Sequence, residues 1–458
     1  MSELAYKRTN VYEVADEKTM KAIFDYAEGY KTFLDEGKTE REACAWAKNA
    51  AIAKGYKPFA FGQSLKKGDK VYYKNRGKNL YLIKIGANAT AEEGIRILAS
   101  HIDSPRIDLK QVPLYEADGI ALGKTHYYGG IRKYQWTTIP LSLHGVVAKK
   151  DGTVLSVAIG EGENDPVFYI SDLLPHLAQR QNAKTLGEAI EGEGLNIWFG
   201  NIPYTFAKED KDKTVKENVL RILNEKYGLE EADFLSAELS LVPAFNARDI
   251  GFDRALIGAY GHDDRVCSYP AFTALFDEDS ENRTVMVVLA DKEEIGSEGT
   301  TGMQCALFTD LVDEIARAFG VSSAYIRSKS KCLSADVNAA YDPNYAEVLE
   351  TNNATHLSCG AGVTKFTGAR GKSGSSDADA EYIAFLRKLF DENGVIWQTG
   401  ELGKVDIGGG GTVAKYIAKM NIDTIDIGVG VVSMHAPYEV ISKADLYEEY
   451  LAFRAFVK

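Results

Sequence analysis

The chain has 458 residues, more than a single hydrophobic core usually holds, so two domains are expected. Its 45% hydrophobic and 26% charged residues are typical of a globular protein rather than a disordered or fibrous one. The formal net charge of −13 argues against a nucleic-acid partner. No segment has the order of a signal peptide, and no run approaches the roughly 20 apolar residues of a membrane helix, so no membrane partner is expected.

The cysteines indicate a reducing compartment. There are five of them, and they are scattered along the chain without Cys-x-x-Cys spacing. This pattern predicts reduced thiols in a cytoplasmic protein, rather than a disulfide scaffold or a thiolate metal site. The positions are Cys44, Cys267, Cys305, Cys332 and Cys359.

Two helices and a strand are predicted near the amino terminus. Apolar residues recur at helical spacing from Met20 to Leu34 and form one apolar stripe. A second helix is expected to begin at Thr39, whose side chain can cap it while Glu42 closes a capping box. The apolar segment 79–85 then predicts a strand.

The composition of the chain changes after about residue 106. From 107 to 247 it shows many short alternating segments, such as 139–147, which indicate a β-rich domain. After residue 260, apolar strands again alternate with helical segments, as at 309–319. We therefore expect an α/β domain with a mostly parallel sheet, formed by residues 1–106 and 248–458. The β-rich domain of residues 107–247 would be inserted into it.

Two adjacent glutamates follow another apolar strand. Residues 285–289 are typical of a buried strand in a parallel sheet, and Glu293 and Glu294 come shortly after them. Ligands of open α/β sheets gather at the carboxyl ends of such strands. Two desolvated carboxylates repel each other unless a cation compensates both. An isolated Glu-Glu pair is more often a solvated acidic turn, so the interpretation depends on other residues.

Two of the seven histidines also follow apolar segments. His101 comes directly after a predicted strand at 96–100, and Asp103 could fix the tautomer of a ligating imidazole. His435 lies just beyond the apolar segment 428–434. Each histidine taken alone could equally be a hydrogen-bonded loop residue.

Asp263 and Asp336 complete an inventory of metal ligands. The adjacent pair Asp263-Asp264 would by itself indicate a turn or a helix cap. In chain order, however, the sequence offers His, Asp, Glu-Glu, Asp and His, mostly at predicted strand ends. A two-metal hydrolytic site needs a bridging carboxylate, a histidine and a carboxylate for each ion, and one unligated base. Nucleophilic catalysis is less well supported, because the sequence has no Gly-x-Ser-x-Gly motif and no cysteine with an evident histidine partner.

Six short motifs are specific when they are taken together. They are His101-Ile-Asp103-Ser-Pro, Ser236 to Pro243, Asp263-Asp264-Arg265-Val, Asp291-Lys-Glu-Glu-Ile-Gly, Ser334-Ala-Asp336 and Met434-His435. In combination they resemble the aspartyl aminopeptidase family of di-zinc metallopeptidases. The resemblance runs from about residue 10 to the carboxyl terminus and includes the β-rich region.

This resemblance implies a set of metal ligands. His101, Asp263 and Asp336 would hold one divalent ion. Asp263, Glu294 and His435 would hold the other, so that Asp263 bridges the two ions. Zinc is the expected metal, although cobalt and manganese suit the same ligand types.

The resemblance also implies the catalytic roles. Glu293 would be the general base that moves a proton from water to the leaving amine, and Asp103 would orient His101. In this superfamily the peptide bond after the bridging aspartate is typically cis, which here would be the bond between Asp263 and Asp264.

Substrate residues and assembly follow from the family with less support from the sequence. A pocket for an acidic side chain needs a cation, and Lys365, Arg370 and Lys372 are candidates that could also be solvated loop charges. His176 resembles a residue that reaches the site of a neighbouring subunit, or it is an interface or surface histidine. The family implies dimers formed through the inserted domain and assembled into a tetrahedral dodecamer.

The sequence as a whole predicts a metal-dependent aminopeptidase. It would release amino-terminal residues, above all Asp and Glu, from short peptides through a water activated by two metals. A carboxypeptidase or an N-deacylase on the same scaffold is one alternative. A catalytically inactive binding or scaffold protein is another, although the complete ligand set argues against it.

Overall fold

The computed structural model describes residues 4–206, 209 and 213–458. The chain forms two compact units, and the first consists of Met1–Ser104, Ala247–Met434 and Glu439–Lys458. The second consists of Pro105–Asn246 together with the short segment His435–Tyr438. The chain passes from the first unit to the second after Ser104 and returns after Asn246. The sequence pattern had indicated boundaries after residues 106 and 247.

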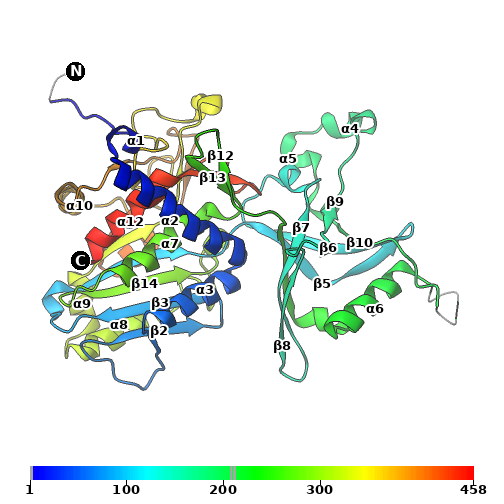
Figure 1. Ribbon diagram of the computed structural model, residues 1–458, viewed down its shortest axis with the longest axis horizontal. Helices are drawn as coiled ribbons and strands as arrows, with labels where there is room; N and C mark the ends of the chain where they lie inside the picture. The colour runs from blue at the N-terminus through cyan, green and yellow to red at the C-terminus, as the bar shows by residue number, and fades with distance from the viewer. Residues whose placement is uncertain (1–3, 207–208, 210–212) are drawn as a thin grey trace. The chain divides into compact units, whose positions relative to one another are not determined.

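The first unit is built around a sheet of nine strands in the order β1-β2-β3-β14-β4-β15-β21-β17-β19 (Figure 1). Five of the eight neighbouring pairs are parallel and three are antiparallel, so the sheet is mixed with parallel pairs in the majority. The strands are Lys57–Pro58 (β1), Lys70–Asn75 (β2), Asn79–Ile85 (β3), Thr284–Ala290 (β14), Ile95–His101 (β4), Lys331–Ala335 (β15), Asp423–Gly428 (β21), Ala361–Thr364 (β17) and Trp397–Thr399 (β19).

Alternate residues of the central strands face two hydrophobic cores. In β3, Leu80 and Leu82 belong to one core, whereas Tyr81 and Ile83 belong to the other. Every residue of β3, β4 and β14 is buried as a result. Burial on both faces explains why these strands are continuous apolar runs in the sequence rather than alternating ones.

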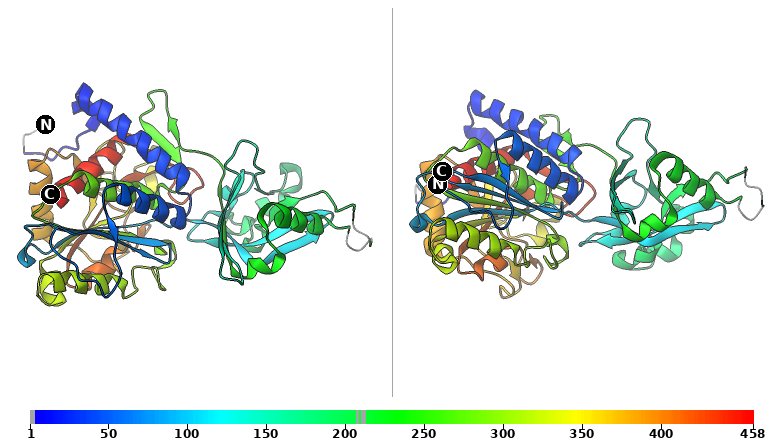
Figure 2. Two further views of the ribbon diagram at one scale, coloured as in Figure 1. Left: turned by 60° about the horizontal axis from the view of Figure 1, so that its bottom comes forward. Right: turned by 90° about the horizontal axis from the view of Figure 1, so that it is seen from below.

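A layer of helices covers each face of this sheet. The first core contains residues of α2 (Glu17–Glu36), α3 (Glu40–Ala53), α7 (His262–Asp277), α10 (Ala380–Glu392) and α12 (Lys443–Val457). The second core contains residues of α8 (Leu307–Ala318), α9 (Ser323–Lys329) and α11 (Ala414–Ala418). Figure 2 shows the blue amino-terminal helices on one side of the sheet and the yellow-green helices α8 and α9 on the other.

The local signals at the amino terminus are confirmed. The predicted capping box is present, because the Thr39 side chain accepts a hydrogen bond from Glu42 N–H and the Glu42 carboxylate accepts one from Thr39 N–H. The helix predicted from Met20 to Leu34 extends over Glu17–Glu36 and is capped by Asp16.

The second unit contains a sheet of seven strands in the order β8-β7-β11-β5-β6-β10-β9, and its pairs are antiparallel. Helix α6 (Val215–Tyr227) packs against β5, β6 and β10. The strands are Val154–Ile159 (β8), Leu141–Ala148 (β7), Ala237–Pro243 (β11), Arg106–Ala117 (β5), Ile120–Tyr128 (β6), Ile197–Gly200 (β10) and Tyr169–Ile170 (β9).

Shorter elements complete both units. They are the helices α1 (Val11–Val14), α4 (Gln179–Asn182) and α5 (Leu186–Ala189), and the strands β12 (Arg248–Ile250), β13 (Leu256–Ala259), β16 (Asn338–Ala339), β18 (Gly368–Ala369), β20 (Gly409–Gly410), β22 (Gly430–Val431) and β23 (Glu439–Ser442). All five cysteines are free thiols. Over the described ranges, the helices are too short or too polar for any of them to cross a bilayer.

Candidate metal centre

Three neighbouring strands bring most of the predicted ligands to one edge of the sheet. Strands β14, β4 and β15 are adjacent and parallel, with Ala290 beside His101 and Ser334 beside Ala99. His101 is the last residue of β4. Glu293 and Glu294 begin a short 3-10 helix just after β14, and Asp336 immediately follows β15. Because the strands are parallel, their carboxyl ends meet, and these side chains converge.

Asp263 reaches the same place from the start of α7. The expected cis peptide joins it to Asp264, and neither residue has helical backbone angles. Both aspartates are buried. Ser104 Oγ donates a hydrogen bond to Asp263 O over 2.6 Å, and Asp263 N–H donates to Glu439 Oε2 over 3.1 Å. The backbone of Asp263 is therefore fixed on both sides.

His101 is the common member of two groups of potential ligands. Its Nε2 lies 3.2 Å from Asp263 Oδ1, 3.9 Å from Glu293 Oε2 and 3.9 Å from Asp336 Oδ1. One group contains His101, Asp263 and Glu294, and the other contains His101, Glu293 and Asp336. Within each group the ligand atoms lie within 4.8 Å of one another. Glu293 thus lies as close to His101 as Asp336 does.

The electrostatics of this cluster suit a cation. Burial raises the pKa of Asp336 well above its usual range, and the neighbouring Glu293 carboxylate raises it further. Burial opposes protonation of His101, but the carboxylates of Asp103 and Asp263 outweigh it and raise the imidazole pKa. Acids held together in a buried place are stabilised by a divalent ion, and imidazole and carboxylate are ligands that zinc accepts. The residues present therefore fit a metal site.

Asp103 connects the histidine to the pair of glutamates. It is fully buried, and its two carboxylate oxygens accept hydrogen bonds from Glu293 N–H at 3.1 Å and from Glu294 N–H at 3.2 Å. His101 Nδ1 lies 3.0 Å from Asp103 O and 3.3 Å from Asp103 Oδ1. The sequence pointed to the contact with His101. It did not point to the contact with the Glu-Glu turn, which lies about 190 residues away in the chain.

Two further carboxylates support the backbone of the site and were missed. Asp264 Oδ2 accepts a hydrogen bond from His101 N–H over 3.2 Å, and Glu439 accepts from Asp263 N–H as described above. The available signals were the position of Asp264 inside the Asp-Asp motif and the position of Glu439 four residues after His435.

The remaining predicted residues lie outside these two groups. His435 belongs to the segment that clusters with the second unit, where its Nδ1 lies 2.9 Å from Gly130 O. His176 lies in an exposed 3-10 turn of the second unit. Lys365 Nζ and Lys372 Nζ both contact one carboxylate, that of Asp377, at 2.6 Å and 3.2 Å.

Buried and half-buried acids that surround a buried histidine at the strand ends of a mixed α/β sheet are the type of ligand set that metal-dependent hydrolases use. Residues 33–457 match the family described as aminopeptidase I zinc metalloprotease (M18). Over 464 residues the chain is 47% identical to a probable M18 family aminopeptidase 1 of Clostridium acetobutylicum, covering 100% of this chain and 99% of the relative. The chain therefore belongs to the M18 family and is a metallo-aminopeptidase.

Solved structures agree with this assignment. The crystal structure of the M18 aminopeptidase from Thermotoga maritima matches with a TM-score of 0.93 at 42% identity, over 99% of this chain and 100% of that one. The S. cerevisiae mApe1 dodecamer matches with a TM-score of 0.77 at 24% identity, over 94% of this chain and 96% of that one, and shows the shared fold alone. The matches do not favour a carboxypeptidase or an N-deacylase.

Proposed function

We propose that this aminopeptidase binds two divalent ions, zinc in the first instance, at the strand-end cluster. His101, Asp263 and Asp336 would hold one ion, and Asp263, Glu294 and His435 the other. The observation that carries the proposal is the convergence of His101 with two overlapping groups of carboxylates. Two bound ions would supply Lewis acidity, which would polarise the scissile carbonyl and lower the pKa of water.

The roles of the protein side chains follow from their surroundings. Glu293 would accept a proton from the attacking water and pass it to the leaving amine. Its backbone is held by Asp103, which also adjoins His101 Nδ1. Asp103 would thereby keep Nε2 of His101 directed at the ions while it fixes the base, so one buried carboxylate would position both groups.

The base assignment is tested by Glu293→Gln. This variant should retain bound metal and lose about 10²- to 10⁴-fold in kcat, because an amide cannot accept the proton. Glu298→Gln is a matched control, since Glu298 is an exposed glutamate five residues further on. Metal content and kcat should be measured on both variants. Turnover near the wild-type rate in Glu293→Gln, or loss of its metal, would show that Glu293 is not the base.

The preferred substrates would carry an amino-terminal Asp or Glu. The supporting observation is that Lys365 and Lys372 already bind a single carboxylate, that of Asp377. These two lysines hold the pKa of Asp377 below its usual value. We propose that the acidic side chain of the substrate takes a comparable place. A panel of Xaa-peptides that compares Asp and Glu with Leu, Lys and Ala tests this preference.

The assembly is proposed to be a homo-oligomer, in which dimers formed through the second unit build a dodecamer. The support comes from the S. cerevisiae mApe1 structure, which is a dodecamer. His176 would then bind substrate in the site of a neighbouring subunit. A cytoplasmic location is proposed from the five free thiols. The mass of the protein in solution tests the assembly. His176→Ala should raise KM without changing that mass, which separates a role in substrate binding from a role in assembly.

A further inference from the structure

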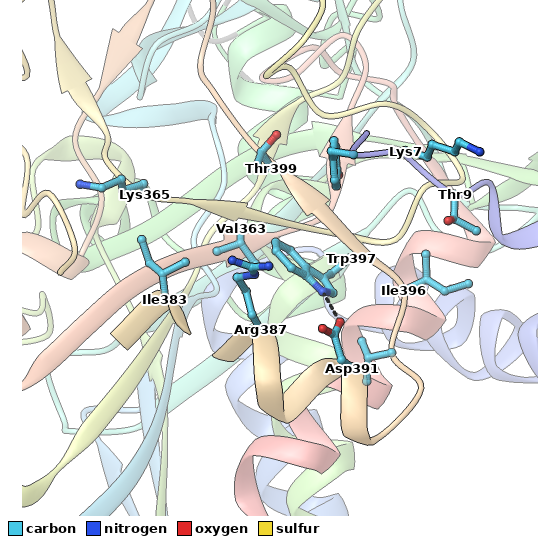
Figure 3. Close-up of a pocket in the computed structure, with 12 residues that line it drawn as sticks. Lys7, Thr9, Val363, Lys365, Ile383, Arg387, Asp391, Ile396, Trp397 and Thr399 are labelled. Carbon is cyan, nitrogen blue, oxygen red and sulfur yellow. Dashed lines mark hydrogen bonds between the residues drawn. The ribbon is translucent and has the colours of Figure 1, made fainter. Parts of the chain in front are cut away.

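A pocket lies at the edge of the nine-stranded sheet, where β19 is the last strand. Its volume is about 690 Å³, within the range of ligand-binding sites. It is lined by α10, by the end of β17, by β19 and by the amino-terminal residues 6, 7 and 9 (Figure 3). None of the metal-centre residues lines it. Lys365 borders it, but its ammonium points away from Trp397 and contacts Asp377 (Figure 3).

The outer edge of β19 presents backbone groups to this pocket. In the described ranges, β19 pairs only with β17, and residues 5–10 make no backbone hydrogen bond to it. Gly400 N–H donates a hydrogen bond to Val363 O. Because the backbone groups of successive residues point to opposite edges of a strand, this bond shows which residues of β19 face β17. The N–H and C=O groups of Trp397 and Thr399 therefore face away from β17. An extended chain could pair with such an edge.

The side chains of the pocket combine positive charge with apolar surface. No ion pair of Arg387 or Lys7 is seen with any described side chain, although the chain carries a net charge of −13. Asp391, the acid of the pocket, accepts a hydrogen bond from Trp397 Nε1 over 3.3 Å. Arg387 from α10 and Trp397 from β19 both line the pocket (Figure 3). Val363 and Val395 are each only 6% exposed and provide an apolar wall.

From these features we propose that this pocket is a binding site for an extended acidic peptide. The peptide backbone pairs with Trp397 and Thr399 at the free edge of β19. An acidic side chain of the peptide binds the Arg387 guanidinium, and an apolar side chain two residues away, on the same face of the peptide strand, packs against the valines. A nucleotide would use the same cation and the indole, but it would leave the backbone groups of the edge strand unused, so the peptide fits the larger set of features.

The probe is an amino-terminally acetylated peptide in which Asp and Val alternate at every second position with Ser between them, so that both face the pocket, and it carries a fluorescent label at its carboxyl end. Because its terminus is blocked, an aminopeptidase does not degrade it, and binding to the intact enzyme can be followed by anisotropy. Arg387→Glu should weaken binding by about tenfold or more, since a charge-assisted contact is replaced by repulsion. Lys388→Glu is the matched control, because Lys388 is the next residue of α10, is exposed and does not line the pocket.

Two further arms test the chemistry of the ligand. The same peptide with Asn in place of every Asp should bind about tenfold more weakly than the probe. Methylation of the peptide nitrogens that face β19 should abolish binding, because a methylated nitrogen cannot donate a hydrogen bond to that strand. A short oligonucleotide should not compete. The proposal is overturned if no binding is seen up to about 1 mM peptide or if the two charge reversals have equal effects. It is also overturned if the Asn exchange or the methylation leaves binding unchanged, or if the oligonucleotide competes. Hydrolysis of short substrates should be unchanged in Arg387→Glu, which separates this site from the metal centre.

Discussion

Two acidic regions of the first unit, each partly buried, differ in how their charge is balanced. Asp249 in β12 is surrounded by three cations: Lys31 and Lys443 at 2.9 Å and Arg254 at 2.8 Å. Burial opposes ionisation of Asp249, but the three cations outweigh it and hold its pKa well below the usual range. At the strand ends, burial raises the pKa of Asp336, and its foremost charged neighbour, Glu293, raises it further.

This difference separates a structural acid from a functional one. The charge of Asp249 is balanced by basic side chains from α2 and α12, so the folded protein needs no further cation there. The carboxylates near His101 would be stabilised by a bound divalent ion. Burial of an acid is therefore a weak sign of function by itself. Burial among other acids is the stronger sign.

Metal removal should have the largest effect in this comparison. Dialysis against a strong chelator should abolish peptide hydrolysis, and added Zn²⁺, Co²⁺ or Mn²⁺ should restore it. The ions should also stabilise the fold, by about 4 kcal/mol at a free concentration near 1,000 times Kd. Activity assays and thermal unfolding of the same samples check both effects. Full activity after verified metal removal would contradict the assignment.

Asp103→Asn should have the next largest effect on activity. The amide retains one acceptor oxygen, but its NH₂ group faces an N–H group of the Glu293-Glu294 turn. A loss of about 10- to 100-fold in metal affinity or kcat/KM is expected. Titration with zinc measures the metal affinity, and steady-state kinetics measure kcat/KM. Asp310→Asn, at an exposed position, is the control. Wild-type values for both quantities would exclude a positioning role for Asp103.

Lys365→Met should alter selectivity more than overall activity. If this lysine binds the acidic side chain of the substrate, the ratio of kcat/KM for Asp over Leu should fall by about tenfold. Lys372→Met should have a smaller effect in the same direction, because its contact with Asp377 is longer. Lys388→Met is the control. An unchanged ratio in both lysine variants would place the specificity elsewhere.

Asp249→Asn should affect stability and leave kcat unchanged. Because the folded state lowers the pKa of Asp249, its contribution to stability is present at neutral pH. That contribution declines as the pH falls below about 4, the pKa in the unfolded chain, toward the lower folded value. The variant should lose about 3 kcal/mol at pH 7, because Lys443 remains buried without its partner. Urea unfolding between pH 3 and pH 7 should show the difference narrowing toward acid, and a constant difference would contradict it.

The sequence predicted the parts of the fold that depend on local pattern. The capping box of Thr39 and Glu42 and the apolar strand that ends at His101 were both readable, because a few neighbouring residues determine them. The cis peptide at Asp263 followed from resemblance to a family, since no local pattern specifies it. The acids near His101 could be listed in order, although their distances required the pairing of β4, β14 and β15.

Contacts between distant segments were the part that could not be predicted. The hydrogen bonds from the Glu293-Glu294 turn to Asp103 cross about 190 residues, and no periodicity in either segment encodes them. The short strands β18 and β20 form within Gly-rich segments that carry no strand signal. The sharing of Asp377 by Lys365 and Lys372 depends on loop geometry, which the sequence pattern leaves open.

Anomalous diffraction from crystals of the zinc-loaded enzyme tests the metal centre most directly. The account predicts two zinc peaks per chain, one within bonding distance of His101, Asp263 and Asp336 and one within bonding distance of Asp263, Glu294 and His435. A single peak, or peaks that these residues do not contact, would contradict it.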